Sequence, residues 1–178
     1  MTAIEVPIKT FQRWLDLLPD PLDLNPAMAV LESYGERMLD LAKTIAWSAE
    51  PVHVARRGEE LLYSLGTSER SGFTLYLVSD GPGVTSPPHE HTTWAVIVGV
   101  QGIERNFLYR QVDGRLRTAA AIEERDVGAQ ECLVLRHEAV HATSVVEEHA
   151  TFHLHLYGRP LHELAPFESR LYSAPGAA

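Results

Sequence analysis

The spacing of hydrophobic residues divides the chain into two parts that meet near residue 60. In the first part, apolar residues recur at intervals of three and four, which is typical of amphipathic helices. This spacing predicts one helix over residues 8–18 and a second from about Asn25 to Ala46. Asn25 is a favoured N-cap, and Pro26 suits the first position of a helix. The first part is therefore expected to be mainly helical.

The second part consists of short segments in which apolar and polar residues alternate or β-branched residues gather. Turn signals separate the segments, among them Ser71-Gly72 and Asp126–Gly128. Asp113-Gly114 is typical of a tight hairpin. Many short strands at this spacing predict an antiparallel β-sandwich or barrel. The predicted strands are Glu60–Leu65, Phe73–Ser79, Trp94–Val100, Phe107–Gln111, Ala119–Ile122, Glu131–Leu135 and Thr151–Tyr157.

Length and composition limit the class of protein. A chain of 178 residues suits a single domain, with 1–58 as a mostly helical cover, 59–161 as the β-barrel and 162–178 as a C-terminal tail. The formal charge of −9 argues against a nucleic acid or an anionic membrane as partner. Cys132 is the only cysteine, so no intramolecular disulfide can form, and a cytoplasmic location is expected.

Two histidines, His89 and His91, stand two residues apart between a proline pair and an apolar, β-branched segment. Pro87 and Pro88 disfavour a helix at this point. Side chains at positions i and i+2 of a strand project from the same face, so both imidazoles can reach one point in space. Two solvent-facing histidines near a turn are the alternative. The surrounding residues favour a metal site, because imidazole is a common metal ligand.

These surroundings resemble the first motif of the cupin superfamily, which is Gly, five residues, His-x-His, three or four residues, Glu, six residues and Gly. The segment GVTSPPHEHTTWAVIVGVQG, from Gly83 to Gly102, fits every spacing, but Ala95 stands where the motif has Glu. Cupins that lack this Glu and hold iron through histidines alone are similar to the thiol dioxygenases, the family of cysteine and 3-mercaptopropionate dioxygenases. The resemblance runs from about Glu60 to Leu161. It implies a double-stranded β-helix fold and an iron(II) cofactor, Fe(2+).

The second cupin motif supplies one more histidine after a turn and a strand. Two residues compete for this position, His137 and His141. His141 is preferred because it follows the apolar pair Ala139-Val140, as the third ligand of the family follows an apolar residue. The resemblance therefore implies that His89, His91 and His141 are the metal ligands, with His137 as the lesser alternative and no carboxylate among them.

The segment Thr151–Tyr157 alternates between two kinds of side chain. Its apolar positions are Phe152, Leu154 and Leu156, and its polar positions are His153, His155 and Tyr157. In a closed barrel the apolar set would pack outward against helices, and the polar set would face the lumen. The polar set resembles the Ser-x-His-x-Tyr triad beside the iron of thiol dioxygenases. This resemblance implies catalytic roles for Tyr157 and His155, while His153 replaces the Ser and bears on substrate choice.

The resemblance implies a reaction in which both atoms of O2 are added to the sulfur of a small thiol, giving a sulfinate. Cysteine dioxygenases grip the substrate carboxylate with an early-strand Arg, and Tyr63 occupies that place here, so a thiol other than cysteine is expected. The 3-mercaptopropionate enzymes place their Arg after the last strand, where Arg159 and Arg170 lie. Tyr63 and Trp94 are candidate pocket walls, with His153 beside them.

Two other functions stay open. One is a different three-histidine cupin reaction, such as oxidative carbon–carbon cleavage of a diketone. The other is a cupin that binds a small molecule or a metal without turnover. The set of polar residues expected in the lumen favours an enzyme, with a small-molecule thiol and O2 as its partners and neither nucleic acid nor a membrane.

Overall fold

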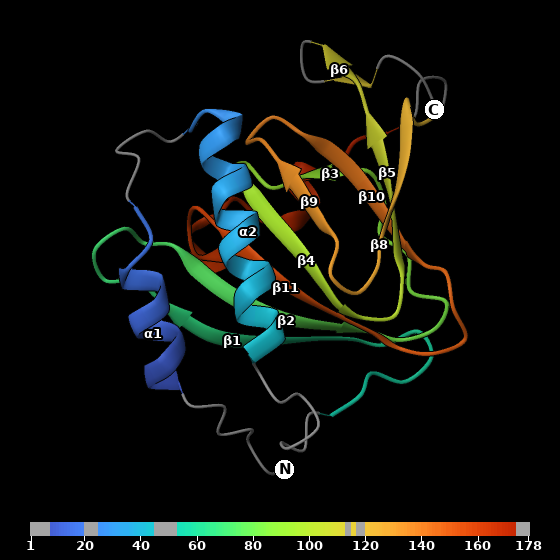
Figure 1. Cartoon of the computed structure of the whole chain (residues 1–178). Helices are drawn as coiled ribbons and strands as arrows, with labels where there is room; N and C mark the ends of the chain where they lie inside the picture. The colour runs from blue at the N-terminus through green and yellow to red at the C-terminus, as the bar shows by residue number, and fades with distance from the viewer. Residues whose placement is uncertain (1–7, 20–24, 45–52, 113–114, 117–119, 174–178) are drawn as a thin grey trace.

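Two antiparallel β-sheets face each other, and two helices cover the outer face of one of them (Figure 1). This computed structural model describes residues 8–19, 25–44, 53–112, 115–116 and 120–173. The helices are α1 (Ile8–Asp16) and α2 (Met28–Thr44), and two short 3₁₀ helices follow the last strand, η1 (Leu161–Glu163) and η2 (Phe167–Arg170). The strands are β1 (Glu60–Thr67), β2 (Thr74–Asp80), β3 (His89–Glu90), β4 (Ala95–Gln101), β5 (Glu104–Tyr109), β6 (Gln111–Val112), β7 (Arg115–Leu116), β8 (Glu123–Val127), β9 (Cys132–Leu135), β10 (Val140–Val145) and β11 (Thr151–Tyr157).

The first sheet has the strand order β1-β2-β11-β4-β9, and the second has the order β3-β10-β5-β8. Every pairing between these strands is antiparallel. The prediction of a mainly β, antiparallel domain with an N-terminal helical cover is thus confirmed. Within the described residues no helix combines the length and apolar character needed to cross a membrane.

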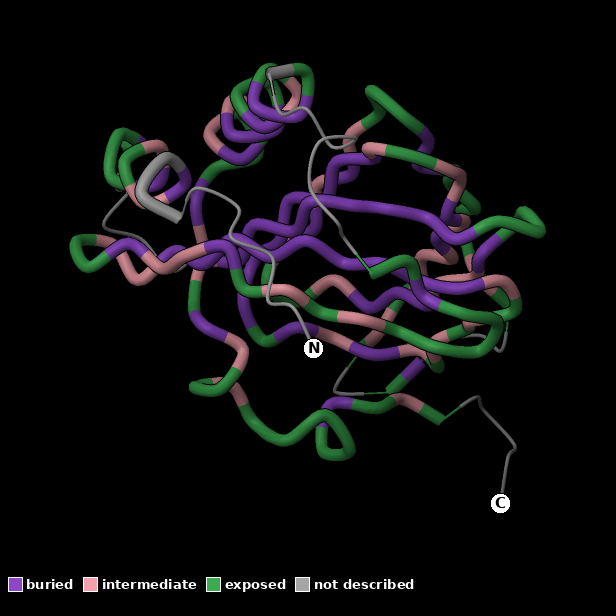
Figure 2. Tube along the Cα trace, turned by 90° about the horizontal axis from the view of Figure 1, so that it is seen from below, coloured by how far each residue is buried: buried purple, intermediate pink, exposed green. Residues whose placement is uncertain are grey.

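The helices close a hydrophobic core against the outer face of the first sheet. Leu15 of α1 and Leu31 of α2 are fully buried there, together with Leu154 of β11. Buried and exposed residues alternate along both helices, whereas the central strands are buried through most of their length (Figure 2). Full burial of a leucine side chain contributes about 1.5–3 kcal/mol. This layer therefore stabilises the sheet whose other face lines the candidate site.

Residues after β11 fold back over the sandwich. Arg170 of η2 is buried, Leu171 forms a β-bridge with His89, and the Tyr172 amide donates to the Pro88 carbonyl at 2.8 Å. The segment expected to be a C-terminal tail therefore packs, up to residue 173, beside the proline-histidine stretch.

Two strands differ from the sequence prediction. The prediction of a strand at Ala119–Ile122 is wrong for the described residues 120–122. The chain joins the sheet only afterwards, at β8. Four of the five β8 residues are exposed and charged, so no apolar alternation marks this edge strand. β10 was also missed, because its pairing with β3 and β5 depends on residues distant in the sequence. Strands β6 and β7 pair on either side of Asp113-Gly114, which itself lies outside the described residues.

Candidate metal centre

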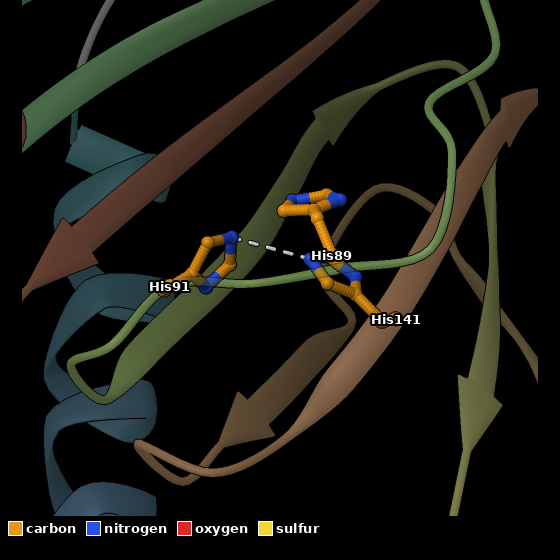
Figure 3. A group of neighbouring side chains, drawn as sticks. All are labelled: His89, His91 and His141. Atoms are coloured by element: carbon orange, nitrogen blue, oxygen red, sulfur yellow. Dashed lines mark hydrogen bonds between the residues drawn. The ribbon is translucent and has the colours of Figure 1, made fainter. Parts of the chain in front are cut away.

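Three histidines from neighbouring strands converge on one point (Figure 3). His89 of β3 lies opposite His141 of β10 in the antiparallel register, and His91 follows β3 directly. The potential ligand nitrogens of the three side chains all lie within 4.8 Å of one another, and all three residues are buried. Nε2 of His91 and Nε2 of His141 are 3.2 Å apart. This group could hold a metal ion. Among the described residues, no carboxylate joins it.

Hydrogen bonds fix which nitrogen of two imidazoles carries the proton. Nδ1 of His89 lies 3.0 Å from the Pro87 carbonyl oxygen, which can only accept, so Nδ1 carries the hydrogen. Nδ1 of His141 donates in the same way to Oδ1 of Asn106, at 2.9 Å. Asn106 is itself oriented by donating from Nδ2 to Glu104 at 3.1 Å. Both imidazoles therefore present a bare Nε2, the arrangement that outer hydrogen bonds impose on metal-bound histidine.

The electrostatics of the site favour neutral ligands. Burial lowers the pKa of all three histidines. The pKa of His91 and of His141 is lowered further by the neighbouring imidazoles. Arg170 lowers the pKa of His89 and His91 as well. At neutral pH the lone pairs are available without loss of a proton, as metal binding requires. The donor set, its protonation and its orientation fit a divalent transition metal.

His155 and Tyr157 project from β11 beside this cluster. Nδ1 of His155 and the hydroxyl oxygen of Tyr157 are 3.0 Å apart, and the Tyr157 ring packs edge-on against His91 with 5.0 Å between ring centroids. Burial lowers the pKa of His155 to about 3 and raises that of Tyr157, so both are neutral at neutral pH. Nε2 of His155 has no partner among the described residues. The pair presents polar atoms to the space next to the three histidines.

A cavity of about 300 Å³ opens at the histidine cluster and is lined by His155 and Tyr157 as well. This volume lies at the lower end of the range for small-molecule sites. Its apolar wall includes Leu62, Val78 and Phe167. The cavity is therefore suited to a small ligand that reaches the three histidines.

Among the described residues that line this cavity, Arg170 is the only Arg or Lys. Its Nη1 donates to the Glu90 carbonyl and its Nε to the Ala165 carbonyl, both at 2.9 Å. The guanidinium carbon lies 5.4 Å from the centroid of the Phe167 ring. Backbone carbonyls thus hold a buried positive charge beside the histidines. Arg159, the other Arg singled out from the sequence, is exposed and does not line the cavity.

Three further residues expected at the pocket lie elsewhere. Tyr63 packs on the helix side of the sheet and donates its hydroxyl to the His53 carbonyl at 3.1 Å. Trp94 is buried in the same outer core, where it packs against Phe73 with ring centroids 4.9 Å apart. His153 faces inward but lies beyond the cavity lining, with Nε2 3.1 Å from the Val127 carbonyl. The structure therefore does not bring these three residues to the cavity.

His137, the alternative third ligand, is exposed and contacts the Glu138 carboxylate at 2.6 Å. The structure brings His141, and not His137, to the His-x-His pair. Three buried polar residues near the site were missed by the sequence analysis, namely Asp80, Glu104 and Asn106. Their sequence signal is weak, because a polar residue within a strand is usually one that faces solvent.

No protein-family model and no curated protein sequence matches the chain. Among solved structures, the chain is similar to a cupin superfamily protein from Desulfitobacterium hafniense, with a TM-score of 0.46 and 17% identity over 67% of this chain and 88% of that one. Oxalate oxidase in complex with the substrate analogue glycolate gives a TM-score of 0.49 and 16% identity over 66% and 60%. Structures of DMSP lyases give 0.43 and 18% over 55% and 46%. At these values the comparisons assign neither a family nor an activity.

Proposed function

We propose that this protein is an iron(II)-dependent dioxygenase that adds both atoms of O2 to the sulfur of a small thiol other than cysteine, giving a sulfinate. The observation that carries the proposal is the cluster of three neutral, buried imidazoles, which among the described residues includes no carboxylate, at a cavity also lined by His155 and Tyr157. The expected stoichiometry is one thiol and one O2 for one sulfinic acid, so no further reductant is needed.

His89, His91 and His141 would hold the iron through their Nε2 atoms. In His89 and His141 a hydrogen bond engages Nδ1, which leaves Nε2 for the metal. When bound, iron(II) supplies the redox chemistry that joins a thiolate sulfur to O2. Three neutral ligands leave the positive charge of the metal uncompensated, which favours an anionic ligand in the cavity. A thiol suits this role because coordination removes its proton outright.

Tyr157 and His155 would orient the reactants. With the proton of His155 on Nδ1, this nitrogen donates to the Tyr157 oxygen, and the tyrosine hydroxyl is left to donate into the cavity. The raised pKa of Tyr157 keeps that proton in place at neutral pH. A hydrogen bond positioned in this way stabilises negative charge as it develops on oxygen in the transition state.

Arg170 would bind an acidic group on the thiol, as in a 3-mercaptopropionate-like substrate. The guanidinium is buried and lines the cavity, so a carboxylate that reaches it is removed from water together with its partner. Tyr63 carries no charge and packs on the far side of the sheet, which supports a thiol other than cysteine.

The test is oxygen consumption by iron-loaded protein with a panel of thiols and, in parallel, a panel of diketones, with sulfinate measured as product. Sulfinate from a small thiol faster than from cysteine supports the proposal. Consumption of O2 with diketones alone would indicate carbon–carbon cleavage at the same three histidines. Binding of thiols without turnover would indicate a cupin that serves as a binding protein.

A further inference from the structure

Two carboxyl groups are buried together at the wall of the cavity. Asp80, the last residue of β2, is 4% exposed, and Glu104, the first residue of β5, is 2% exposed. They come from opposite sheets, both line the cavity, and their side chains form a hydrogen bond with each other. Glu60, paired with Asp80 in the neighbouring strand, brings a third carboxyl group to the same wall.

One carboxyl oxygen of Asp80, Oδ1, receives no hydrogen bond from the described residues. The nearby His153 does not supply one, since its Nε2 carries the proton donated to the Val127 carbonyl and its neutral Nδ1 can only accept. Burial raises the pKa of both Asp80 and Glu104, and the neighbouring Glu60 carboxyl group raises both further, although His153 lowers that of Asp80. Buried acceptors are nearly always satisfied, so this one calls for a missing donor.

We propose that the Asp80–Glu104 pair binds a positively charged nitrogen carried by the thiol substrate, so that the preferred substrate is an aminothiol. This inference rests on the proposed function and names the chemical class of the substrate. A protonated amine has several donors and no acceptor, which matches an unpartnered Asp80 oxygen beside a second carboxyl group.

The position of the pair relative to the metal centre supports one ligand that spans both. Glu104 accepts from Asn106 at 3.1 Å, and Asn106 accepts from His141 at 2.9 Å, so two hydrogen bonds connect the acidic wall to a metal ligand. A substrate with its sulfur at the histidines and its amine at the acidic wall would span the two ends of this cavity.

The surface between the two ends also suits an organic chain better than a second metal ion. Val78 precedes Asp80 by two residues on β2, and Leu62 follows Glu60 by two on β1, so each apolar side chain shares the face of its acidic neighbour. Methylene groups can pack on this wall, whereas a hydrated ion gains nothing from it. Arg170 lines the same cavity and would serve any carboxylate that the same substrate carries.

The first test measures binding without chemistry. Iron-free protein is titrated calorimetrically with 3-aminopropanol, which has the cationic end and no sulfur, and with propanol as the uncharged match. We expect binding of the amine only, and a loss of about 10–100-fold in affinity for Asp80→Asn, the usual range for a hydrogen bond to a charged group. Glu123→Gln, an exposed β8 residue outside the cavity, is the control for a change in net charge and should bind as the wild type does.

The second test uses iron-loaded protein and thiols that differ in charge: 2-mercaptoethanol, 3-mercaptopropionate and aminothiols of increasing chain length. We expect the lowest KM with an aminothiol and a rise in that KM of about 10–100-fold in Asp80→Asn, with the KM for 2-mercaptoethanol unchanged. Glu60→Gln changes an exposed carboxylate at the same wall. This variant should fold normally because the buried pair is intact, and it should shift the same KM in the same direction.

The outcomes separate this inference from the proposed function. Amine binding that depends on Asp80, without oxidation of any thiol, would support the cation site and overturn the dioxygenase. Oxidation of thiols regardless of charge, unaltered in Asp80→Asn and Glu60→Gln, would overturn the cation site and leave the dioxygenase. Binding of Mg²⁺ or Ca²⁺, but not the amine, in an Asp80-dependent manner would also overturn the aminothiol site.

Discussion

Successive residues of β11 face two different environments. Outward, Leu154 and its apolar neighbours pack against the helices in a hydrophobic core. Inward, His153, His155 and Tyr157 face the interior of the sandwich. Both faces are buried to a similar extent, so burial alone does not distinguish them.

The difference lies in what burial does to the free energy of folding. The outer face is stabilised in proportion to the apolar area that it removes from water. The inner face buries polar atoms, among them Nδ1 of His153 and Nε2 of His155 without partners, and such groups cost free energy. Polar groups that persist at such a cost are expected where a function requires them. Stability and chemistry are thus assigned to opposite faces of one strand.

The largest effect is expected from removing a metal ligand on the inner side. His141→Ala should weaken iron binding by more than about 100-fold, because loss of even an outer partner of a ligand costs about 10–100-fold. The fold should be retained, since the outer core is untouched. Iron content by elemental analysis and circular dichroism measure the two effects. Full iron in His141→Ala, with loss in the exposed control His137→Ala, would move the third ligand to His137.

On the outer face the opposite result is expected. Leu154→Ala should lower the free energy of unfolding by about 2–5 kcal/mol, because a fully buried leucine leaves a cavity. Iron bound per folded molecule should stay unchanged. Urea unfolding of the variant is compared with Leu17→Ala, which alters an exposed leucine and should have little effect. Loss of iron at unchanged stability would contradict the division between the two faces.

Tyr157→Phe tests the inner face without touching a metal ligand. Turnover should fall by about 10–1000-fold, the range for loss of one positioned polar group. Iron content should not change, because the ring that packs on His91 remains. Steady-state oxygen consumption measures the effect. If Tyr157→Phe turns over every thiol tested as fast as the wild type does, Tyr157 takes no part in the mechanism.

Asn106→Ala tests whether the second sheet orients the metal ligand that it contacts. The variant removes the acceptor for Nδ1 of His141, so this imidazole is free to rotate and to change tautomer. Iron affinity should fall by about 10–100-fold. A competition titration with a chromophoric chelator measures it. An unchanged affinity would show that strand pairing alone orients His141.

The smallest effect concerns the stability of the metal-free protein as a function of pH. Burial beside Glu104 raises the pKa of Asp80 above its ordinary value of 3.8, so the folded state retains a proton that the unfolded chain releases. The wild type therefore loses stability as the pH rises above that value. Asp80→Asn lacks this group, so its stability relative to the wild type should increase with pH in urea unfolding. A constant difference would contradict the raised pKa.

Sequence patterns were sufficient where the signal is local. The alternation in β11 and the spacing of His89 and His91 depend on strand geometry alone, and the structure places these residues as expected. The interaction of Asn106 with His141 spans 35 residues and depends on the pairing of β5 with β10, which no local pattern encodes. The burial of Trp94 in the outer core was likewise not predicted, since this residue follows a bend at residues 92–93 and directly precedes β4.

The most direct test of the central claim is a reaction under ¹⁸O2 with iron-loaded protein and the best thiol of the panel. The account predicts a sulfinate in which both oxygens carry the label, and no labelled product from His141→Ala. Unlabelled oxygen from solvent water in the sulfinate, a labelled product from carbon–carbon cleavage, or the absence of sulfinate with every thiol would contradict it. Mass spectrometry of the product distinguishes these results.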